Sequence, residues 1–256
     1  MGDLLYHERY GTGPVLVFLH GFSLDRRMWQ PQLDAFAAHH SVLLYDLRGF
    51  GRSPLPDGEY SHVDDLLTLM DHLQIESAAL IGLSRGGGVA INFTLAHPGR
   101  VNHLVAVDSV LDGHRWSDSQ RSADQAVWDC AKRDGLEAGK AAWLAHPLFV
   151  APFRQASVKA AAAQMVADYS GWHFFNRDPV RSLKPYAIER LHEITCPTLT
   201  IVGEEDLIDF QQIADSLSSK VPNGRKVVLP NVGHLSNMEA PESFNQVVLK
   251  FLETGE

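Results

Sequence analysis

A serine stands at the centre of a G-x-S-x-G motif over residues 82–86, directly after the apolar run Ala78–Ile81 and ahead of a helical pattern. In a strand-to-helix setting, this spacing is typical of a sharp turn that holds a serine hydroxyl out at the top of a sheet. Glycine at positions 82 and 86 removes side chains that would collide across such a turn. We therefore expect Ser84 to be a catalytic nucleophile; a purely structural glycine-rich turn is the alternative.

A serine hydroxyl is a poor nucleophile at neutral pH, so it needs a general base and a carboxylate that orients the base. In a sheet of this kind the chain order is serine, acid, histidine, each on a loop after a core strand. Of thirteen histidines, His234 lies after the strand that ends near Leu229 and before the last helix, next to Gly233. We expect His234 to be the base; a histidine that caps the final helix is the alternative.

The acid has two candidates. Asp206 lies four residues after the predicted strand Thr198–Val202, at a loop tip from which it can accept the Nδ1–H of His234. Asp108 is the rival because it ends the preceding strand at the same sheet edge. We favour Asp206 and interpret its neighbours as solvated loop charges, namely Glu204, Glu205 and Asp209.

Acyl transfer also needs donors for an oxyanion. The backbone N–H of Arg85 directly follows the nucleophile at a helix N-terminus. The second donor is expected from the loop after Val15–Leu19, where Gly21 allows the N–H of Phe22 to turn inward. We interpret His20 as a buried residue that holds this loop in place.

Short apolar strands alternate with amphipathic helices along the chain, which predicts a mostly parallel sheet covered on both faces. The expected core strands are Val15–Leu19, Val42–Asp46, Ala78–Ile81, His103–Val107, Thr198–Val202 and Lys226–Leu229. Leu4–Glu8 is expected as an antiparallel edge strand. Ser61 is expected to cap a helix, and the helix after Ser84 is expected to run to Ala96.

Residues 111–192 break this rhythm. They hold four of the five tryptophans, an alanine-rich run and four prolines, and they indicate several helices without a strand between them. We interpret them as a helical cap inserted into a core of residues 1–110 and 193–256; a run of sheet-covering helices is the alternative.

Composition excludes several classes of function. A chain of 256 residues with 45% apolar residues, 21% charged residues and a formal charge of −9 is not expected to bind nucleic acid or an anionic membrane surface. The polar, acidic start Met1-Gly2-Asp3 predicts no signal peptide, so a cytoplasmic location is expected. No metal or cofactor is indicated: Cys130 and Cys196 are isolated, no H-E-x-x-H occurs, and the dinucleotide fingerprint at Gly11-x-Gly13 is incomplete.

Together, five segments resemble the signature blocks of the α/β-hydrolase superfamily in order and span nearly the whole chain: His20-Gly21-Phe22, residues 46–53, residues 82–87, Gly203-Glu204-Glu205-Asp206 and Gly233-His234. The resemblance implies an α/β-hydrolase fold with a helical cap. Its closest subgroups are small carboxylesterases, enol-lactonases and hydrolases of carbon–carbon bonds in ring-cleavage products. Residues 20–29 are also similar to cofactor-free perhydrolases. Enol-lactonases generally lack the His-Gly pair, and a serine at position 84 argues against dehalogenases and epoxide hydrolases, which use aspartate.

Arg85 departs from the family pattern, because serine members commonly have Met, Leu or Gln there. Dehalogenases that act on small halo-carboxylates resemble this chain in having arginine at the matching position, which suggests that the substrate carries a carboxylate. Pairing of Arg85 with an acid of the cap or core is the alternative. Trp143 and Trp172 are candidates to line an apolar substrate pocket, although cap aromatics often serve packing alone.

The sequence thus predicts a serine hydrolase that cleaves a small carboxylic ester or lactone through an acyl-Ser84 intermediate. The alternatives are a carbon–carbon hydrolase, a cofactor-free perhydrolase and, from another class, a ligand receptor built on the same fold. The sequence leaves the identity of the substrate and the oligomeric state open.

Overall fold

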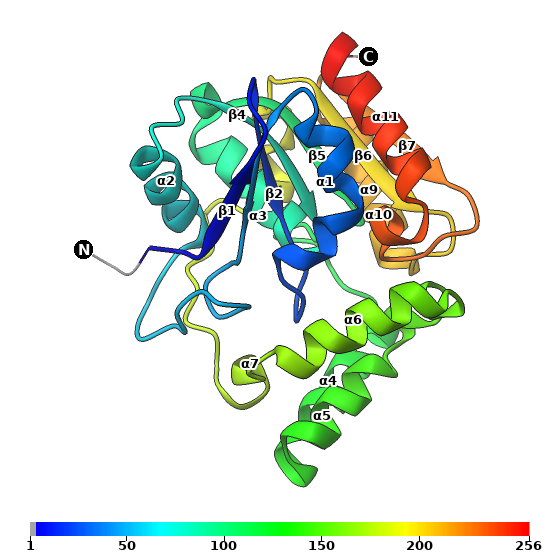
Figure 1. Cartoon of the computed structure of the whole chain (residues 1–256). Helices are drawn as coiled ribbons and strands as arrows, with labels where there is room; N and C mark the ends of the chain where they lie inside the picture. Colours follow the sequence, from blue (N-terminus) through cyan, green and yellow to red (C-terminus); the bar gives the residue numbers. More distant parts are fainter. Residues whose placement is uncertain (1–3, 256) are drawn as a thin grey trace.

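The computed structural model describes residues 4–255 (Figure 1). The chain start Met1-Gly2-Asp3, on which the expectation of no signal peptide depends, lies outside the described residues. Within the described range, no helix is both long and apolar enough to cross a membrane.

Seven strands of the described chain form one sheet in the order β1-β3-β2-β4-β5-β6-β7. Only β1 runs antiparallel to its neighbour, and all other pairs are parallel. The strands are β1 (His7–Tyr10), β2 (Val15–Leu19), β3 (Ser41–Tyr45), β4 (Ala78–Leu83), β5 (Val101–Val107), β6 (Thr198–Gly203) and β7 (Gly224–Leu229). The mostly parallel sheet is therefore confirmed, with several strand ends that differ by one to three residues.

The largest difference concerns the edge strand. It is antiparallel as expected, but it covers His7–Tyr10 rather than Leu4–Glu8. Its bounds are set by pairing with β3, where Tyr10 lies opposite Val42 and His7 opposite Tyr45. The predicted bounds Leu4–Glu8 were therefore wrong.

Helices cover both faces of the sheet. Helices α1 and α11 pack against each other on the near side in Figure 1, and α2 and α3 contact each other on the other side. The core helices are α1 (Gln30–Ala37), α2 (His62–His72), α3 (Arg85–Ala96), α9 (Ile208–Lys220), α10 (Ser236–Glu239) and α11 (Pro241–Thr254). As expected, the side chain of Ser61 caps α2 by accepting the N–H of Asp64, and α3 ends at Ala96.

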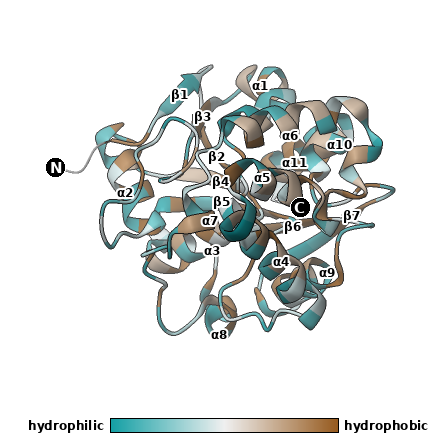
Figure 2. Ribbon diagram, turned by 90° about the horizontal axis from the view of Figure 1, so that it is seen from below, coloured by the Kyte–Doolittle hydropathy of each residue, from teal (hydrophilic) through white to brown (hydrophobic). Residues whose placement is uncertain are grey.

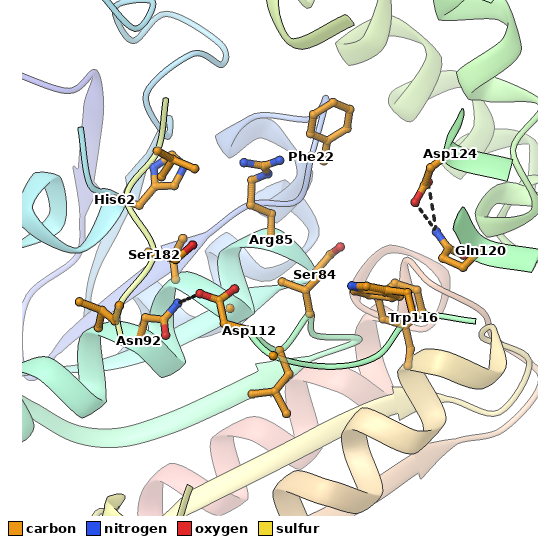
Figure 3. A pocket seen from close by; sticks show the side chains of 18 of the residues that line it. Phe22, His62, Ser84, Arg85, Asn92, Asp112, Trp116, Gln120, Asp124 and Ser182 are labelled. Atoms are coloured by element: carbon orange, nitrogen blue, oxygen red, sulfur yellow. Dashed lines mark hydrogen bonds between the residues drawn. The ribbon is translucent and has the colours of Figure 1, made fainter. Parts of the chain in front are cut away.

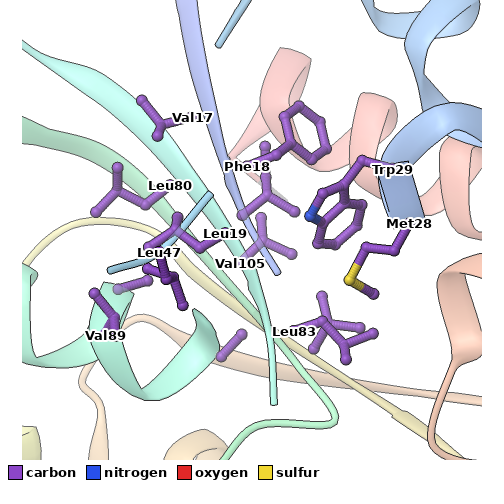
Figure 4. Packing of buried hydrophobic residues seen from close by; sticks show 14 of the residues in the cluster. Val17, Phe18, Leu19, Met28, Trp29, Leu47, Leu80, Leu83, Val89 and Val105 are labelled. Carbon is purple, nitrogen blue, oxygen red and sulfur yellow. The ribbon is translucent and has the colours of Figure 1, made fainter. Parts of the chain in front are cut away.

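The hydrophobic core lies on both sides of the central strands. Successive residues of a strand point to opposite faces. On β2, Phe18 meets the edge of Trp29 at a ring distance of 5.0 Å, whereas Val17 points to the other face (Figure 4). Close packing on both faces fixes the sheet, and with it the loops at the carboxyl ends of the parallel strands.

Residues 111–192 form a layer of helices and contain no strand. Val180 in this layer forms an isolated β-bridge with Tyr60. The helices of the layer are α4 (Asp118–Asp134), α5 (Leu136–Leu144), α6 (Ala156–Asp168), α7 (Trp172–Phe175) and α8 (Ala187–Arg190). Helices α4–α7 lie below the sheet in Figure 1, and the view from below shows α4, α5 and α7 in front of the strands (Figure 2). Short 3-10 helices complete the chain at Arg26–Trp29, Pro98–Arg100, Pro147–Phe149, Pro152–Arg154 and Leu191–Glu193.

Candidate active site

Ser84 occupies a strained turn between β4 and α3. Its backbone has φ +53° and ψ −115°, a conformation that costs free energy and persists only where the surroundings fix it. A Cβ at position 82 would lie 2.3 Å from the carbonyl oxygen of Gly86, and a Cβ at position 86 would lie 2.2 Å from that of Leu19. The G-x-S-x-G spacing is thus explained by close backbone approach on both sides of the serine.

The side chain of His234 contacts Asp206. Their atoms Nδ1 and Oδ2 are 2.9 Å apart, and both residues are buried. Burial, the largest single influence, would lower the pKa of His234, but the carboxylate of Asp206, together with those of Asp108 and Glu239, raises it by more, so the net pKa is raised. Within residues 4–255, Nε2 of His234 makes no hydrogen bond to Ser84, a contact that in such sites commonly tightens only when substrate binds.

Asp108, the other candidate acid, faces elsewhere. Its Oδ1 accepts the N–H of Gly203 at 2.8 Å, and its Oδ2 accepts the hydroxyl of Ser236 at 2.6 Å. Burial, followed by the nearby charge of Asp206, raises the pKa of Asp108 well above its usual range. Asp108 therefore joins the two loops that carry Asp206 and His234 without contacting the histidine.

Two backbone amides beside Ser84 have no hydrogen-bond partner in the described part of the chain: those of Phe22 and Arg85. The amide of Arg85 is at the first position of α3, where no intrahelical acceptor exists. Both residues line a cavity together with Ser84. These amides are the two that the sequence predicts as oxyanion donors.

His20 fixes the direction of the Phe22 amide. Its Nε2 accepts the N–H of Leu47 at 2.9 Å, so its Nδ1–H donates to the carbonyl of Gly21 at 2.8 Å. The Gly21 carbonyl and the Phe22 N–H belong to one planar trans peptide, in which they point in opposite directions. The bond to His20 thus turns the Phe22 N–H away from the buried ring, and the interpretation of His20 as a loop-holding residue is confirmed.

Two cavities meet at the serine. The larger has a volume of about 700 Å³ and is lined by Ser84, Phe22, Arg85 and residues of α2–α5. The smaller, of about 30 Å³, is lined by both Ser84 and His234. The predicted nucleophile and base therefore border one space that continues into a cavity large enough for a small molecule.

Arg85 pairs with an acid from residues 111–192, which agrees with the second of the two interpretations given for Arg85 above. One guanidinium nitrogen lies 3.3 Å from Asp178, and the guanidinium carbon stands 5.1 Å from the ring centre of Phe22. The side chain of Arg85 remains 28% exposed and lines the larger cavity. The guanidinium is thus partnered by the protein itself, although only one of its N–H groups is used.

The two tryptophan candidates are placed differently. Trp143 lines both cavities, and its indole N–H donates to the hydroxyl of Ser23 at 2.6 Å. Trp172 lines neither cavity and packs edge-on against His173, with ring centres 4.9 Å apart. The structure therefore brings Trp143 to the site and leaves Trp172 outside it.

Several lining residues carry no sequence signal that distinguishes them. Figure 3 shows them around Ser84, on α2, α3 and α4 and in the segments that follow β5 and α7. They have no common spacing, and the cavity collects them from distant segments: His62, Asn92, Asp112, Trp116, Gln120, Asp124 and Ser182. No group of histidine, cysteine or acidic side chains able to hold a metal ion occurs within residues 4–255.

Comparison with known proteins gives a consistent result. A family model described as alpha/beta hydrolase fold matches residues 14–241. The chain is 32% identical over 268 residues to a Caulobacter protein named "Putative carbamate hydrolase RutD", with 98% of this chain and 96% of that protein covered. It is also similar to a thermophilic esterase from Thermogutta terrifontis (28% identity, TM-score 0.80, 98% and 93% covered). An enol-lactonase from Burkholderia xenovorans is similar as well (26% identity, TM-score 0.80, 97% and 96% covered).

Proposed function

The chain belongs to the α/β-hydrolase fold family, and from this premise we propose that it is a serine hydrolase that cleaves a carboxylic ester or lactone through an acyl-Ser84 intermediate. The observation that carries the proposal is the 2.9 Å contact between Asp206 and His234, because this histidine shares a cavity with Ser84. The esterase and enol-lactonase among the similar structures support the same class of substrate.

In the first half of the proposed reaction, Ser84 Oγ attacks the substrate carbonyl carbon, and His234 Nε2 takes the hydroxyl proton. The carbonyl oxygen becomes an oxyanion, for which the free amides of Phe22 and Arg85 are the donors. The bond to the leaving oxygen then breaks, and this oxygen takes the proton from His234. In a lactone the leaving hydroxyl remains attached to the acyl group.

In the second half, His234 takes a proton from water, and the resulting hydroxide attacks the acyl-serine carbonyl. The proton then returns to Ser84 Oγ as the carboxylic acid leaves. Asp206 accepts the Nδ1–H of His234 throughout, which fixes the tautomer that leaves Nε2 free to act as a base, and it stabilises the imidazolium form in both halves.

The larger cavity defines the scale of the substrate. A volume of about 700 Å³ lies within the usual range for small-molecule sites. Three indole side chains line it: Trp116, Trp128 and Trp143. We propose that Trp143 contacts the acyl group, because it borders both cavities and its polar N–H is already bonded to Ser23. We assign Trp172 no substrate contact.

A carbamate is the second candidate substrate. Its carbonyl can form a carbamoyl-serine by the same steps, and the relative in Caulobacter has carbamate hydrolysis in its name. The identity of 32% across nearly the full length of both chains favours this candidate over carbon–carbon hydrolysis and perhydrolysis. Neither of those two reactions is named for the Caulobacter protein, the esterase or the enol-lactonase.

The test is a panel of substrates with the wild type and Ser84→Ala. It contains p-nitrophenyl esters of increasing acyl length, a γ-lactone, a carbamate and a ring-cleavage dienoate. We expect the wild type to turn over an ester or a lactone many times, and we expect Ser84→Ala to lose this activity. Cleavage of the dienoate alone would assign carbon–carbon hydrolysis instead. A ligand-dependent rise in melting temperature without turnover would assign a receptor.

A further inference from the structure

The two cavities that meet at Ser84 differ in their access to solvent. The lining of the larger cavity includes the exposed residues Arg121, Gln125 and Arg181, so this cavity opens at the protein surface. None of the described residues that line the smaller cavity is exposed. We call the smaller cavity the side pocket, because a molecule from solvent reaches it through the larger one.

The walls of the side pocket are apolar. Apart from Ser84, His234 and the loop residues Gly21-Phe22, every residue of its lining has an apolar or aromatic side chain: Leu24, Leu83, Trp143, Leu148, Phe149 and Leu235. The one polar group among these side chains is the indole N–H of Trp143, which already donates to Ser23. The side pocket therefore favours a hydrocarbon group over a group that needs hydrogen bonds.

One wall residue, Phe149, is held firmly by its neighbours. Its ring stacks on that of Phe153, with ring centres 4.8 Å apart, and it meets the ring of Trp143 edge-on at 5.5 Å. Phe149 is only 3% exposed. Its ring therefore cannot turn away from the side pocket without losing packing on two sides.

The segment that follows Phe149 is anchored to the loop that carries His234. A Cβ at position 233 would lie 2.7 Å from the Cβ of Ala151, which shows how closely the two segments approach. The side-chain amide of Gln155 donates to the backbone carbonyl of Glu239 at 2.9 Å. Because these contacts tie the wall to the histidine loop, widening the side pocket would disturb the catalytic base.

The order of the proposed reaction decides which part of the substrate enters each cavity. The alcohol must depart while the acyl group is still bonded to Ser84, and water must then reach the same carbon. An alcohol in the side pocket would be trapped behind the acyl-serine, whereas one in the larger cavity has a route to solvent. His234 lines only the side pocket, but the leaving oxygen is bonded to the carbonyl carbon at Ser84 and so stays near the base.

We propose that the side pocket binds the alkyl part of the acyl group and limits it to one or two carbons, so that the substrate is an acetyl or propionyl ester of a larger alcohol. The inference rests on the proposed hydrolase function and narrows its substrate class. The side pocket has a volume of about 30 Å³. A water molecule needs roughly 10–15 Å³ of such space, so about two groups of that size fit.

The first test compares two isomeric esters, hexyl acetate and methyl heptanoate. They have the same atoms and the same kind of ester bond, but the long chain is on the alcohol in one and on the acid in the other. We expect kcat/KM of hexyl acetate to be about a hundredfold higher or more, because each methylene that does not fit a pocket costs roughly tenfold or more. Equal values would overturn the proposal. A preference for methyl heptanoate would also overturn it, because it would assign the side pocket to the alcohol.

The second test enlarges the side pocket. We expect Phe149→Ala to lower the ratio of the two kcat/KM values about tenfold or more, and Phe149→Leu to lower it by less. The leucine variant keeps an apolar side chain in the wall and serves if the alanine variant does not fold. The matched control is Leu183→Ala, which enlarges only the larger cavity and is expected to keep the ratio. An unchanged ratio in the Phe149 variants, or an equal fall in Leu183→Ala, would overturn the proposal.

A measurement of acyl transfer separates this inference from the hydrolase proposal. The wild type is mixed with p-nitrophenyl acetate or p-nitrophenyl hexanoate and quenched rapidly, and the mass of the chain gives the rate at which Ser84 is acylated. If acetyl transfer is faster but neither ester is turned over repeatedly, the side pocket stands and the hydrolase proposal fails. If both esters are turned over with equal kcat/KM, the hydrolase proposal stands and the side pocket fails. If neither ester acylates Ser84, both proposals fail.

Discussion

The carboxylate of Glu239 holds the backbone on both sides of His234. One oxygen accepts the amide N–H of Gly233 at 2.9 Å, and the other accepts that of Leu235 at 3.0 Å. These are the residues directly before and after the histidine, and the Glu239 side chain is buried beneath them. The position of the imidazole ring therefore depends on a carboxylate five residues further along the chain.

Replacing Glu239 with Gln keeps one acceptor but places an NH₂ group against the other backbone N–H. We expect Glu239→Gln to lower the free energy of unfolding by about 1–3 kcal/mol, the cost of a buried donor without an acceptor. We also expect kcat to fall while KM changes little, because the loop positions the base. Urea unfolding and steady-state kinetics measure the two effects. Glu242→Gln, an exposed change on α11, is the control, and equal kcat values in the two variants would refute the positioning role.

Substitutions of the two buried aspartates near His234, Asp206 and Asp108, are expected to affect different properties. Asp206→Asn should lower kcat by roughly ten thousandfold, because the carboxylate that fixes the tautomer of His234 is lost. Asp108→Asn should act mainly on stability, because Asp108 bonds Gly203 and Ser236 rather than the histidine. Kinetics and thermal melting of both variants test this, and a mild Asp206→Asn with a severe loss of kcat in Asp108→Asn would transfer the role to Asp108.

The activity is expected to depend on pH through His234. A general base must be unprotonated, so kcat/KM should rise with pH. Its midpoint should lie above 6.5, the ordinary pKa of histidine, because Asp206 and the neighbouring carboxylates together raise the pKa of His234 by more than burial lowers it. Asp206→Asn should shift this midpoint to lower pH. A midpoint that does not move in this variant would mean that another group titrates.

The same shift predicts a pH dependence of stability. The folded-state pKa of His234 is raised, so the folded state binds the proton more tightly than the unfolded state. The stabilisation is fully present below the unfolded pKa of about 6.5 and is lost as pH rises through the folded pKa. The difference in unfolding free energy between the wild type and His234→Gln should therefore be largest at low pH. A difference that grows with pH would contradict the assigned direction.

The variant Arg85→Met separates the role of the Arg85 backbone amide from that of its guanidinium. The amide remains in Arg85→Met, so turnover of small neutral esters should persist. Because the guanidinium pairs with Asp178, we expect KM to change equally for a neutral ester and for its carboxylate-bearing analogue. If KM rises only for the carboxylate substrate, by an amount equivalent to about 1.5–3 kcal/mol of binding free energy, the guanidinium binds a substrate carboxylate instead.

The sequence predicts features whose cause is local. Gly82 and Gly86 are required by backbone approach within a few residues of Ser84, so the motif carries its own structural explanation. The apolar runs of the central strands are buried on both faces and were therefore recognisable without knowledge of their neighbours. The predicted start of the edge strand was wrong by three residues, because the bounds of this strand depend on its pairing with β3 rather than on its own composition.

Features that depend on long-range packing were not predictable. Asp112 and Asn92 are twenty residues apart, and His62 belongs to a different helix, so no spacing joins them. Trp143 and Trp172 look alike in the sequence, yet only Trp143 reaches the cavity. The packing of the helices in residues 111–192 decides which aromatic face turns toward Ser84.

The most direct test of the central claim is the mass of the protein during turnover. The wild type is mixed with a rapidly cleaved p-nitrophenyl ester, quenched in acid, and analysed by mass spectrometry of the intact chain and of its peptides. We predict a gain of one acyl group, located on the peptide at Ser84, and no such gain in a folded Ser84→Ala variant. An acyl group on another residue would contradict the account, as would more than about a thousandth of the wild-type activity in Ser84→Ala.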